Sequence, residues 1–204
     1  MKLILFQALI FTLLSQLTSA LFEGSPLITQ SKSFQQFHDL IYSSDYLSVL
    51  LICSSRSPKC KEIDSDYAKL AETAKSWAEF YGIDCDTLDR KEAEEFVICS
   101  ESKVDDYPLL VFFEPKYDEE GKKDLVEHIY EGVFDIDSLE EFGLERIPSF
   151  IDTIKDKEEL EEFLNKRGKL NSVLYFTEDT DIPSSYKVLS SEYKDRIKVL
   201  ERLS

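Results

Sequence analysis

Residues 47–60 read Leu-Ser-Val-Leu-Leu-Ile-Cys-Ser-Ser-Arg-Ser-Pro-Lys-Cys, an apolar run followed at once by the signals that begin a helix. The run from 46 to 53 carries no charge, which is typical of a strand buried on both faces of a central sheet. Ser57 supplies an N-cap hydroxyl, and Pro58 suits the first helical position. The stretch therefore predicts a central strand that leads directly into a helix.

The rest of residues 21–144 predicts further helices and strands around this central strand. Apolar residues recur at helical spacing over 33–42 and along the helix that begins after Ser57. Further strands are expected at 78–85, 109–113 and 128–131, and further helices at 88–97 and 137–142. From the central strand onward the order is β-α-β-α-β-β-α. This order predicts an α/β sandwich, a central mixed sheet with helices on both faces.

A second unit is expected over residues 145–204. Strands at 150–154, 172–176 and 197–203 alternate with helices at 157–166 and 184–193, which gives βαβαβ. So short a unit has a marginal core. We therefore expect it to pack on the first domain or on a partner, or else the chain is a shortened form of something longer.

The first 20 residues predict a cleaved secretory signal peptide. Lys2 precedes an apolar run, and Thr18-Ser19-Ala20 supplies the small residues of a cleavage site. The apolar run is shorter than the ~20 residues that span a bilayer. We expect no stable membrane insertion, and a mature chain that lies in the secretory pathway or outside the cell.

The formal net charge is −17 at pH 7. Binding to nucleic acid through phosphates requires a basic surface, so nucleic acid is excluded as a partner. An acidic chain is soluble, and its charge also suits weak, diffuse calcium binding. No Asp-x-Asp-x-Asp-Gly loop of an EF-hand is present, however.

The four cysteines are Cys53, Cys60, Cys85 and Cys99. An even number in an oxidising compartment predicts pairing, with three possible connectivities. Their spacing fits no zinc finger or ribbon, and the chain has only 2 histidines. We therefore expect no metal site, and no cofactor is indicated.

Several segments resemble the thioredoxin domains of protein disulfide isomerases. They are Ser57-Pro58-Lys59-Cys60-Lys61, Tyr67-Ala68-Lys69-Leu70-Ala71, Ile83-Asp84-Cys85, Tyr107-Pro108-Leu109-Leu110 and Tyr130-Glu131-Gly132. They follow the family's order over residues 30–143, and residues 145–204 resemble the opening half of a second, redox-silent domain. The resemblance implies a thioredoxin-like sandwich followed by a partial second thioredoxin-like unit.

The chain departs from the family at the residues that carry the redox chemistry. Ser57 stands where the resemblance places the first cysteine of Cys-x-x-Cys, and a hydroxyl cannot replace a thiolate in disulfide exchange. Leu51 stands where the family has a buried carboxylate, and Arg56 stands where it has a tryptophan. The family's arginine after the edge strand is also missing, at residues 133–134. The motif Ser57-x-x-Cys60 is therefore interpreted as degenerate, with no catalytic residue. Cys60 and Cys53 are expected to remain reduced.

The resemblance also implies roles outside this motif. Cys85 and Cys99 correspond to a structural disulfide of the family, and Pro108 to a proline with a cis peptide bond beside the active site. Ser57, Tyr107 and Pro108 are expected to form a surface that binds a client or partner polypeptide.

Three functions follow from these expectations. The leading one is a redox-inactive relative of protein disulfide isomerase in the endoplasmic reticulum lumen, which binds polypeptides during protein folding. One alternative is a weak thiol–disulfide oxidoreductase or isomerase that uses Cys60 with Cys53. The other is an acidic lumenal protein that binds calcium with low affinity.

Overall fold

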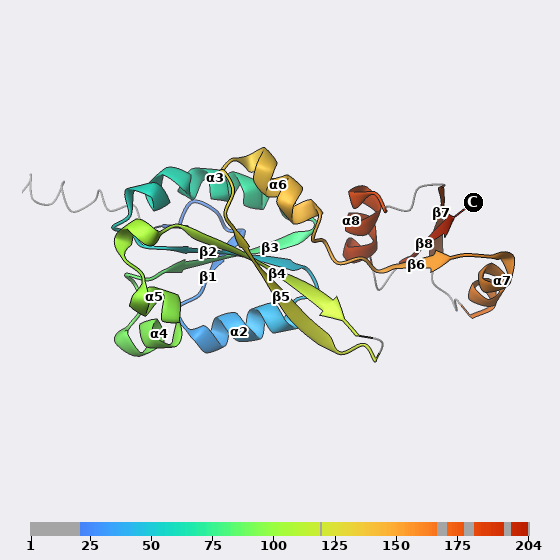
Figure 1. Cartoon of the computed structure of the whole chain (residues 1–204), viewed down its shortest axis with the longest axis horizontal. Coiled ribbons are helices and arrows are strands. Elements are labelled where there is room, and N and C mark those ends of the chain that lie inside the picture. Colours follow the sequence, from blue (N-terminus) through green and yellow to red (C-terminus); the bar gives the residue numbers. More distant parts are fainter. Residues whose placement is uncertain (1–20, 119, 167–170, 178–181, 194–196, 204) are drawn as a thin grey trace, which may run out of the picture.

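The computed structural model describes residues 21–118, 120–166, 171–177, 182–193 and 197–203 (Figure 1). The expected signal peptide, residues 1–20, lies outside these ranges. Within them, no helix is both long and apolar enough to cross a membrane.

The first domain is built on a five-stranded mixed sheet in the order β1-β3-β2-β4-β5. Its strands are β1 (Ile28–Gln30), β2 (Leu47–Cys53), β3 (Ala78–Asp84), β4 (Leu109–Tyr117) and β5 (Lys123–Tyr130). β1 and β2 run parallel to β3, whereas β4 is antiparallel to both β2 and β5. Every residue of β2 is buried, as the uncharged run predicts.

Helices cover both faces of this sheet (Figure 1). One face carries α2 (Phe34–Ser43), α4 (Arg90–Glu95) and α5 (Val97–Glu101), and the other carries α3 (Pro58–Ala74) and α6 (Ile136–Leu144). A short 3-10 turn, η1 (Val104–Asp106), precedes β4. The predicted sandwich, a central mixed sheet with helices on both faces, is confirmed.

Helix α3 is anchored to the sheet by a buried tyrosine. The hydroxyl of Tyr67 lies 2.9 Å from the carbonyl oxygen of Val49 and 2.8 Å from that of Tyr81. These carbonyls belong to β2 and β3, so one side chain links the helix to both strands. Complete burial raises the pKa of this phenol well above its ordinary value, which keeps it neutral.

The sequence did not predict every element of the first domain correctly. Strand β1 was missed, the expected helix 88–97 is two short helices, and the β4–β5 hairpin is longer than expected. The extra length of β4 includes Glu114, which is buried although charged. Its carboxylate forms an ion pair with Lys116, and its Oε2 lies 2.9 Å from Nε2 of His128. These partners offset the cost of burying a charge within a strand.

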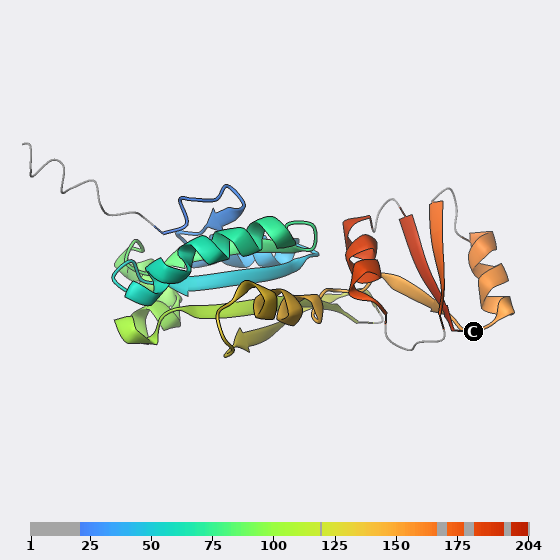
Figure 2. The ribbon, with the colours of Figure 1, turned by 90° about the horizontal axis from the view of Figure 1, so that it is seen from above.

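The second unit has the βαβαβ order that the sequence predicts. Its strands are β6 (Ile151–Ile154), β7 (Asn171–Thr177) and β8 (Ile197–Leu203), and its helices are α7 (Lys157–Lys166) and α8 (Ser184–Glu192). The strands form a parallel sheet in the order β6-β8-β7. Helices α7 and α8 lie on opposite sides of this sheet (Figure 2).

Helix α8 lies between the second sheet and the first domain (Figure 2). Its Val188 packs against the buried apolar cluster that includes the core of the first domain and Ile147. Nearby, the rings of Tyr117 and Phe150 have centroids 5.7 Å apart, which gives a second contact between the units. Within the second unit, Ser190 of α8 accepts a hydrogen bond of 3.1 Å from the backbone N–H of Phe150, which fixes α8 beside the start of that unit. The second unit is thus docked on the first.

Candidate functional site

Ser57 lies at the junction of β2 and α3, immediately before the first turn of the helix. It occupies the N-cap position with Pro58 after it, as predicted, but its side chain forms no capping hydrogen bond. The residue is only 1% exposed. The expected capping role of the hydroxyl is therefore wrong, and Ser57 presents almost no surface to a partner.

Cys53 and Cys60 are joined by a disulfide, with their Cα atoms 5.8 Å apart. The expectation that both stay reduced is wrong. The loop after β2 turns back on itself, with the Ser57 N–H donating to the Ser54 carbonyl at 2.9 Å. This turn brings the end of the strand within disulfide distance of the first turn of the helix. Both cysteines are 0% exposed, so the bond lies inside the domain.

The structure joins Cys85 to Cys99, the pair that the resemblance implied, with an S–S distance of 2.01 Å and a Cα separation of 5.3 Å. Both residues are partly exposed. The hydroxyl of Tyr107 lies 3.3 Å from Sγ of Cys85 and 3.3 Å from the carbonyl oxygen of Ile98. Tyr107 therefore packs against this disulfide from the inside of the domain, where it is buried.

The peptide bond between Tyr107 and Pro108 is cis, as expected. Of the three residues assigned to the polypeptide-binding surface, only Pro108 has appreciable exposure, because Ser57 and Tyr107 are buried. Pro58 and Lys59, at the start of α3, are exposed. Little of the predicted residue set therefore lies at the surface.

The loop between β2 and α3 is held by Asp86, a residue that sequence reasoning missed. Its carboxylate accepts hydrogen bonds from the hydroxyls of Ser54 (2.6 Å) and Ser55 (3.1 Å) and from Nε of Arg56 (2.8 Å). Asp84 Oδ1 also accepts from the Ser55 N–H at 3.0 Å. We call this set of contacts the Asp86 clamp. Its signal in the sequence is an acidic residue two positions after the end of the strand that pairs with β2.

The clamp keeps Asp86 ionised. Partial burial alone would raise the pKa of this carboxyl, but the hydrogen bonds from Arg56, Ser54 and Ser55 outweigh it and lower the pKa to about 2. The loop that covers the Cys53–Cys60 disulfide is therefore held by a charged group at all but strongly acidic pH.

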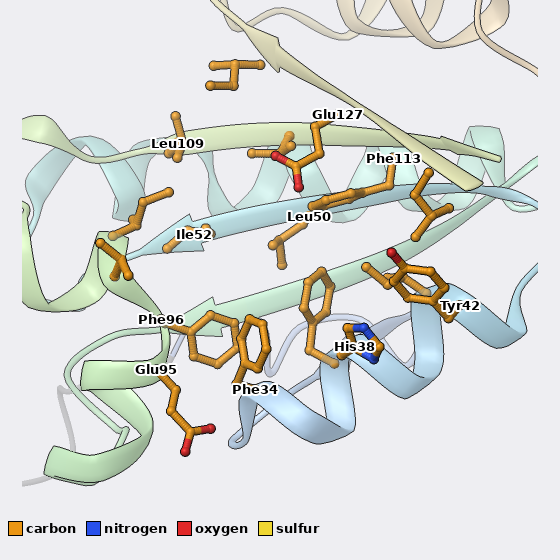
Figure 3. Close-up of a pocket in the computed structure, with 17 residues that line it drawn as sticks. Phe34, His38, Tyr42, Leu50, Ile52, Glu95, Phe96, Leu109, Phe113 and Glu127 are labelled. Carbon is orange, nitrogen blue, oxygen red and sulfur yellow. The ribbon is translucent and has the colours of Figure 1, made fainter. Parts of the chain in front are cut away.

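A second feature, an apolar groove, lies on the face of the sheet that carries α2, α4 and α5 (Figure 3). Its volume is about 450 Å³, within the usual range for ligand sites. Its lining residues, which come from α2, the α4–α5 segment and strands β2, β4 and β5, are Phe34, Phe37, His38, Ile41, Tyr42, Leu50, Ile52, Glu95, Phe96, Val97, Ile98, Leu109, Val111, Phe113, Leu125, Glu127 and Ile129. We refer to this surface as the groove.

Two apolar side chains of the groove are largely exposed, Val97 at 57% and Ile129 at 55%. One end of the groove begins at Leu109, which follows Pro108 directly. Near the other end, Lys123 ties the β4–β5 hairpin to α2. Its Nζ donates to the carbonyls of Ile41 (3.1 Å) and Tyr42 (3.0 Å), and also to that of Ser44.

The groove was not predicted from the sequence. Its signal is the alternation of Leu125, Glu127 and Ile129 along β5, which places all three on one face of an edge strand.

No family profile and no curated protein matches this sequence. Among solved structures, the chain is similar to ERdj5 in crystal form II, with a TM-score of 0.59 and 18% identity over 96% of this chain and 24% of that one. It is also similar to full-length ERdj5, with a TM-score of 0.51 and 18% identity over 95% of this chain and 26% of that one. The chain spans about a quarter of each of these structures. The fold is thioredoxin-like.

Leu51, at the position that the resemblance assigns to a buried carboxylate, is fully buried in β2. Across the described ranges, no group of three or more His, Cys, Asp or Glu side chains is placed to hold a metal ion. The features that present surface for binding are the groove and the adjoining Pro108.

Proposed function

We propose that this chain is a redox-inactive protein of the protein disulfide isomerase type, which binds client or partner polypeptides in the secretory pathway, in the lumen of the endoplasmic reticulum. The thioredoxin-like fold and the segments that resemble the family support the class of protein. The signal-like residues 1–20 and the two disulfides support an oxidising compartment.

The groove is the observation that carries the binding function. An exposed apolar surface of this kind usually marks an interaction site, because burying it against a partner removes apolar area from water. The groove adjoins Pro108, so the polypeptide-binding surface expected at that proline extends along the groove. Ser57 and Tyr107 support this surface from within rather than contacting the partner.

The absence of redox turnover is inferred from access as well as from residue type. Exchange requires an exposed thiolate that can attack, or a disulfide that a thiolate can reach. Ser57 offers no thiol, and the Cys53–Cys60 disulfide is enclosed by the protein and covered by the clamped loop.

A binding assay that compares two valine-to-aspartate variants tests the proposed polypeptide-binding function. Reduced, carbamidomethylated ribonuclease A, a basic chain whose cysteines are capped without added charge, serves as the unfolded client, with binding followed by fluorescence anisotropy. Val97→Asp places a charge in the groove and should weaken binding about tenfold or more, because a charge is costly to desolvate. Val133→Asp is the matched control, since Val133 is 74% exposed and lies outside the groove. Equal affinities for the two variants would contradict the proposal.

The proposed redox inactivity has its own test. Insulin turbidity with dithiothreitol should match the blank without protein, because neither Ser57 nor a buried disulfide can exchange with the substrate. A rate close to that of an active isomerase, lost in Cys60→Ala, would contradict redox inactivity while leaving the binding function intact.

One observation favours a second candidate, the weak oxidoreductase that uses Cys60 with Cys53. The two cysteines are bonded to each other, which is the arrangement that such a cycle needs. Equilibration in glutathione buffers, followed by thiol alkylation and peptide mapping, tests it. Reversible opening of this disulfide at the potential of the endoplasmic reticulum would favour this candidate, and persistent oxidation would exclude it. The calcium alternative rests on net charge alone.

A further inference from the structure

Glu127 is the one acidic side chain of β5 that lines the groove. Strand alternation places it on the same face as Leu125 and Ile129, opposite Phe113 in the register of β4 and β5. Its side chain extends from β5 over the apolar floor of the groove, towards Leu50 (Figure 3). The carboxylate thus lies at the surface beside apolar side chains of the groove.

The charge of Glu127 has no partner among the residues that the structure describes. The other carboxylate of the groove, that of Glu95, forms an ion pair of 3.6 Å with Lys91 on its own helix. Glu114, on the neighbouring strand, is paired with Lys116 and His128. Within the described ranges, Glu127 has neither a hydrogen bond nor an ion pair of this kind, so it is available to a ligand.

We propose that the groove selects polypeptide segments in which a lysine or arginine lies beside large apolar side chains, and that Glu127 binds the cation. This inference rests on the proposed polypeptide-binding function and names the class of segment bound. The apolar walls take up the apolar side chains. The apolar side chains of the bound segment cover part of the ion pair, which strengthens it relative to a pair on an open surface.

Net charge favours the same occupant. With a net charge of −17, the chain attracts basic segments and repels acidic ones, and this electrostatic effect acts at distances longer than those of direct contacts. A second copy of this acidic chain is the less favourable occupant, because two molecules of like charge repel each other.

The test uses the mature chain, residues 21–204, and three fluorescent peptides that share a Leu-Phe-X-Leu-Phe centre between Gly-Ser ends. X is arginine, its neutral isostere citrulline, or glutamate. The wild type should bind the arginine peptide about fivefold to tenfold more tightly than the citrulline peptide, and the glutamate peptide most weakly. Added salt should reduce this preference, since the pair is partly screened.

Two matched variants separate Glu127 from the general charge. Glu127→Gln should bind the arginine and citrulline peptides equally, with the citrulline affinity unchanged from wild type. Glu131→Gln removes the same charge just beyond β5 and outside the groove, so it should keep the preference. Because both glutamates are exposed, neither substitution should impair folding.

Three outcomes would overturn the inference. Equal wild-type affinities for the arginine and citrulline peptides would leave the proposed function standing without this selectivity. An equal loss of preference in both glutamine variants would assign it to overall charge. If no peptide bound, but sedimentation showed a dimer that Val97→Asp dissociated, the groove would be a contact between copies. The proposed function would then fail as well.

Discussion

The two units of this molecule begin with the same arrangement and end differently. Strands β1, β2 and β3 of the first unit lie in the order β1-β3-β2, and those of the second in the corresponding order β6-β8-β7, all parallel. In the first unit, β4 then pairs with β2, and α6 packs against α3. Among the described residues, no strand pairs with the outer edge of β7.

This difference shows what completes a thioredoxin-like core. All seven residues of β2 are buried, whereas residues 171–176 of the corresponding β7 are exposed or only partly buried. Strand β2 is paired on both edges, by β3 and β4, and helices cover both faces of its sheet, whereas β7 lies at an edge. With no counterpart of the β4–β5 hairpin among its described residues, the second unit depends on α8 and its contact with the first domain.

The strongest test of this comparison separates the two units. Residues 145–204 expressed alone should fail to fold cooperatively, because a short unit with an unpaired edge buries too little apolar surface to offset chain entropy. Near-ultraviolet circular dichroism should be weak and amide exchange fast. Residues 21–144 are the control and should melt cooperatively. A cooperative melt of monomeric 145–204 would show that the second unit is self-sufficient.

The second test concerns the disulfides, which occur only in the first unit. Cys85→Ala should lower the free energy of unfolding by about 2–5 kcal/mol, because the bridge restricts the unfolded chain. Urea denaturation of the oxidised protein measures this change. The same variant under reducing conditions is the control and should differ little from the reduced wild type. A loss well below 1 kcal/mol in the oxidised protein would contradict a structural role.

The smallest expected effect concerns the Asp86 clamp. A carboxyl whose pKa is lowered on folding stabilises the folded state above its unfolded pKa of about 3.9. That contribution is lost as the pH falls through the folded value of about 2. The stability difference between wild type and Asp86→Asn should therefore be constant from pH 7 to 5 and shrink between pH 4 and 2.

Asp66→Asn provides the matched control for the clamp. Asp66 forms an exposed ion pair with Lys69 on α3, at 2.8 Å, and such surface pairs contribute little. Its removal should change stability much less at neutral pH. A pH profile of Asp86→Asn parallel to that of wild type down to pH 2 would contradict the role of the clamp.

The sequence predicted the fold well where one pattern acts locally. The uncharged run of β2, the Ser57-Pro58 helix start and the βαβαβ order of the second unit are all present. The three-residue strand β1 was missed because so short a segment carries no periodicity.

The candidate site was harder to predict because its features depend on segments far apart in sequence. The resemblance implied Cys85–Cys99, but residue spacing alone leaves cysteine connectivity open. The Cys53–Cys60 bond depends on how the loop turns back after β2, and burial of Ser57 depends on packing around that loop. The groove requires α2, α5 and β5 to meet, which no single segment of sequence indicates.

The contact of Lys123 with α2 affects which side chains the groove admits. Its ammonium group bonds to three carbonyls at the end of the helix, so the hairpin and α2 cannot separate there without breaking these bonds. The width of the groove near Tyr42 is therefore fixed, whereas its wall near Val97 belongs to a helix of only five residues. The molecule should thus discriminate by size at the Tyr42 end and tolerate varied shapes at the other.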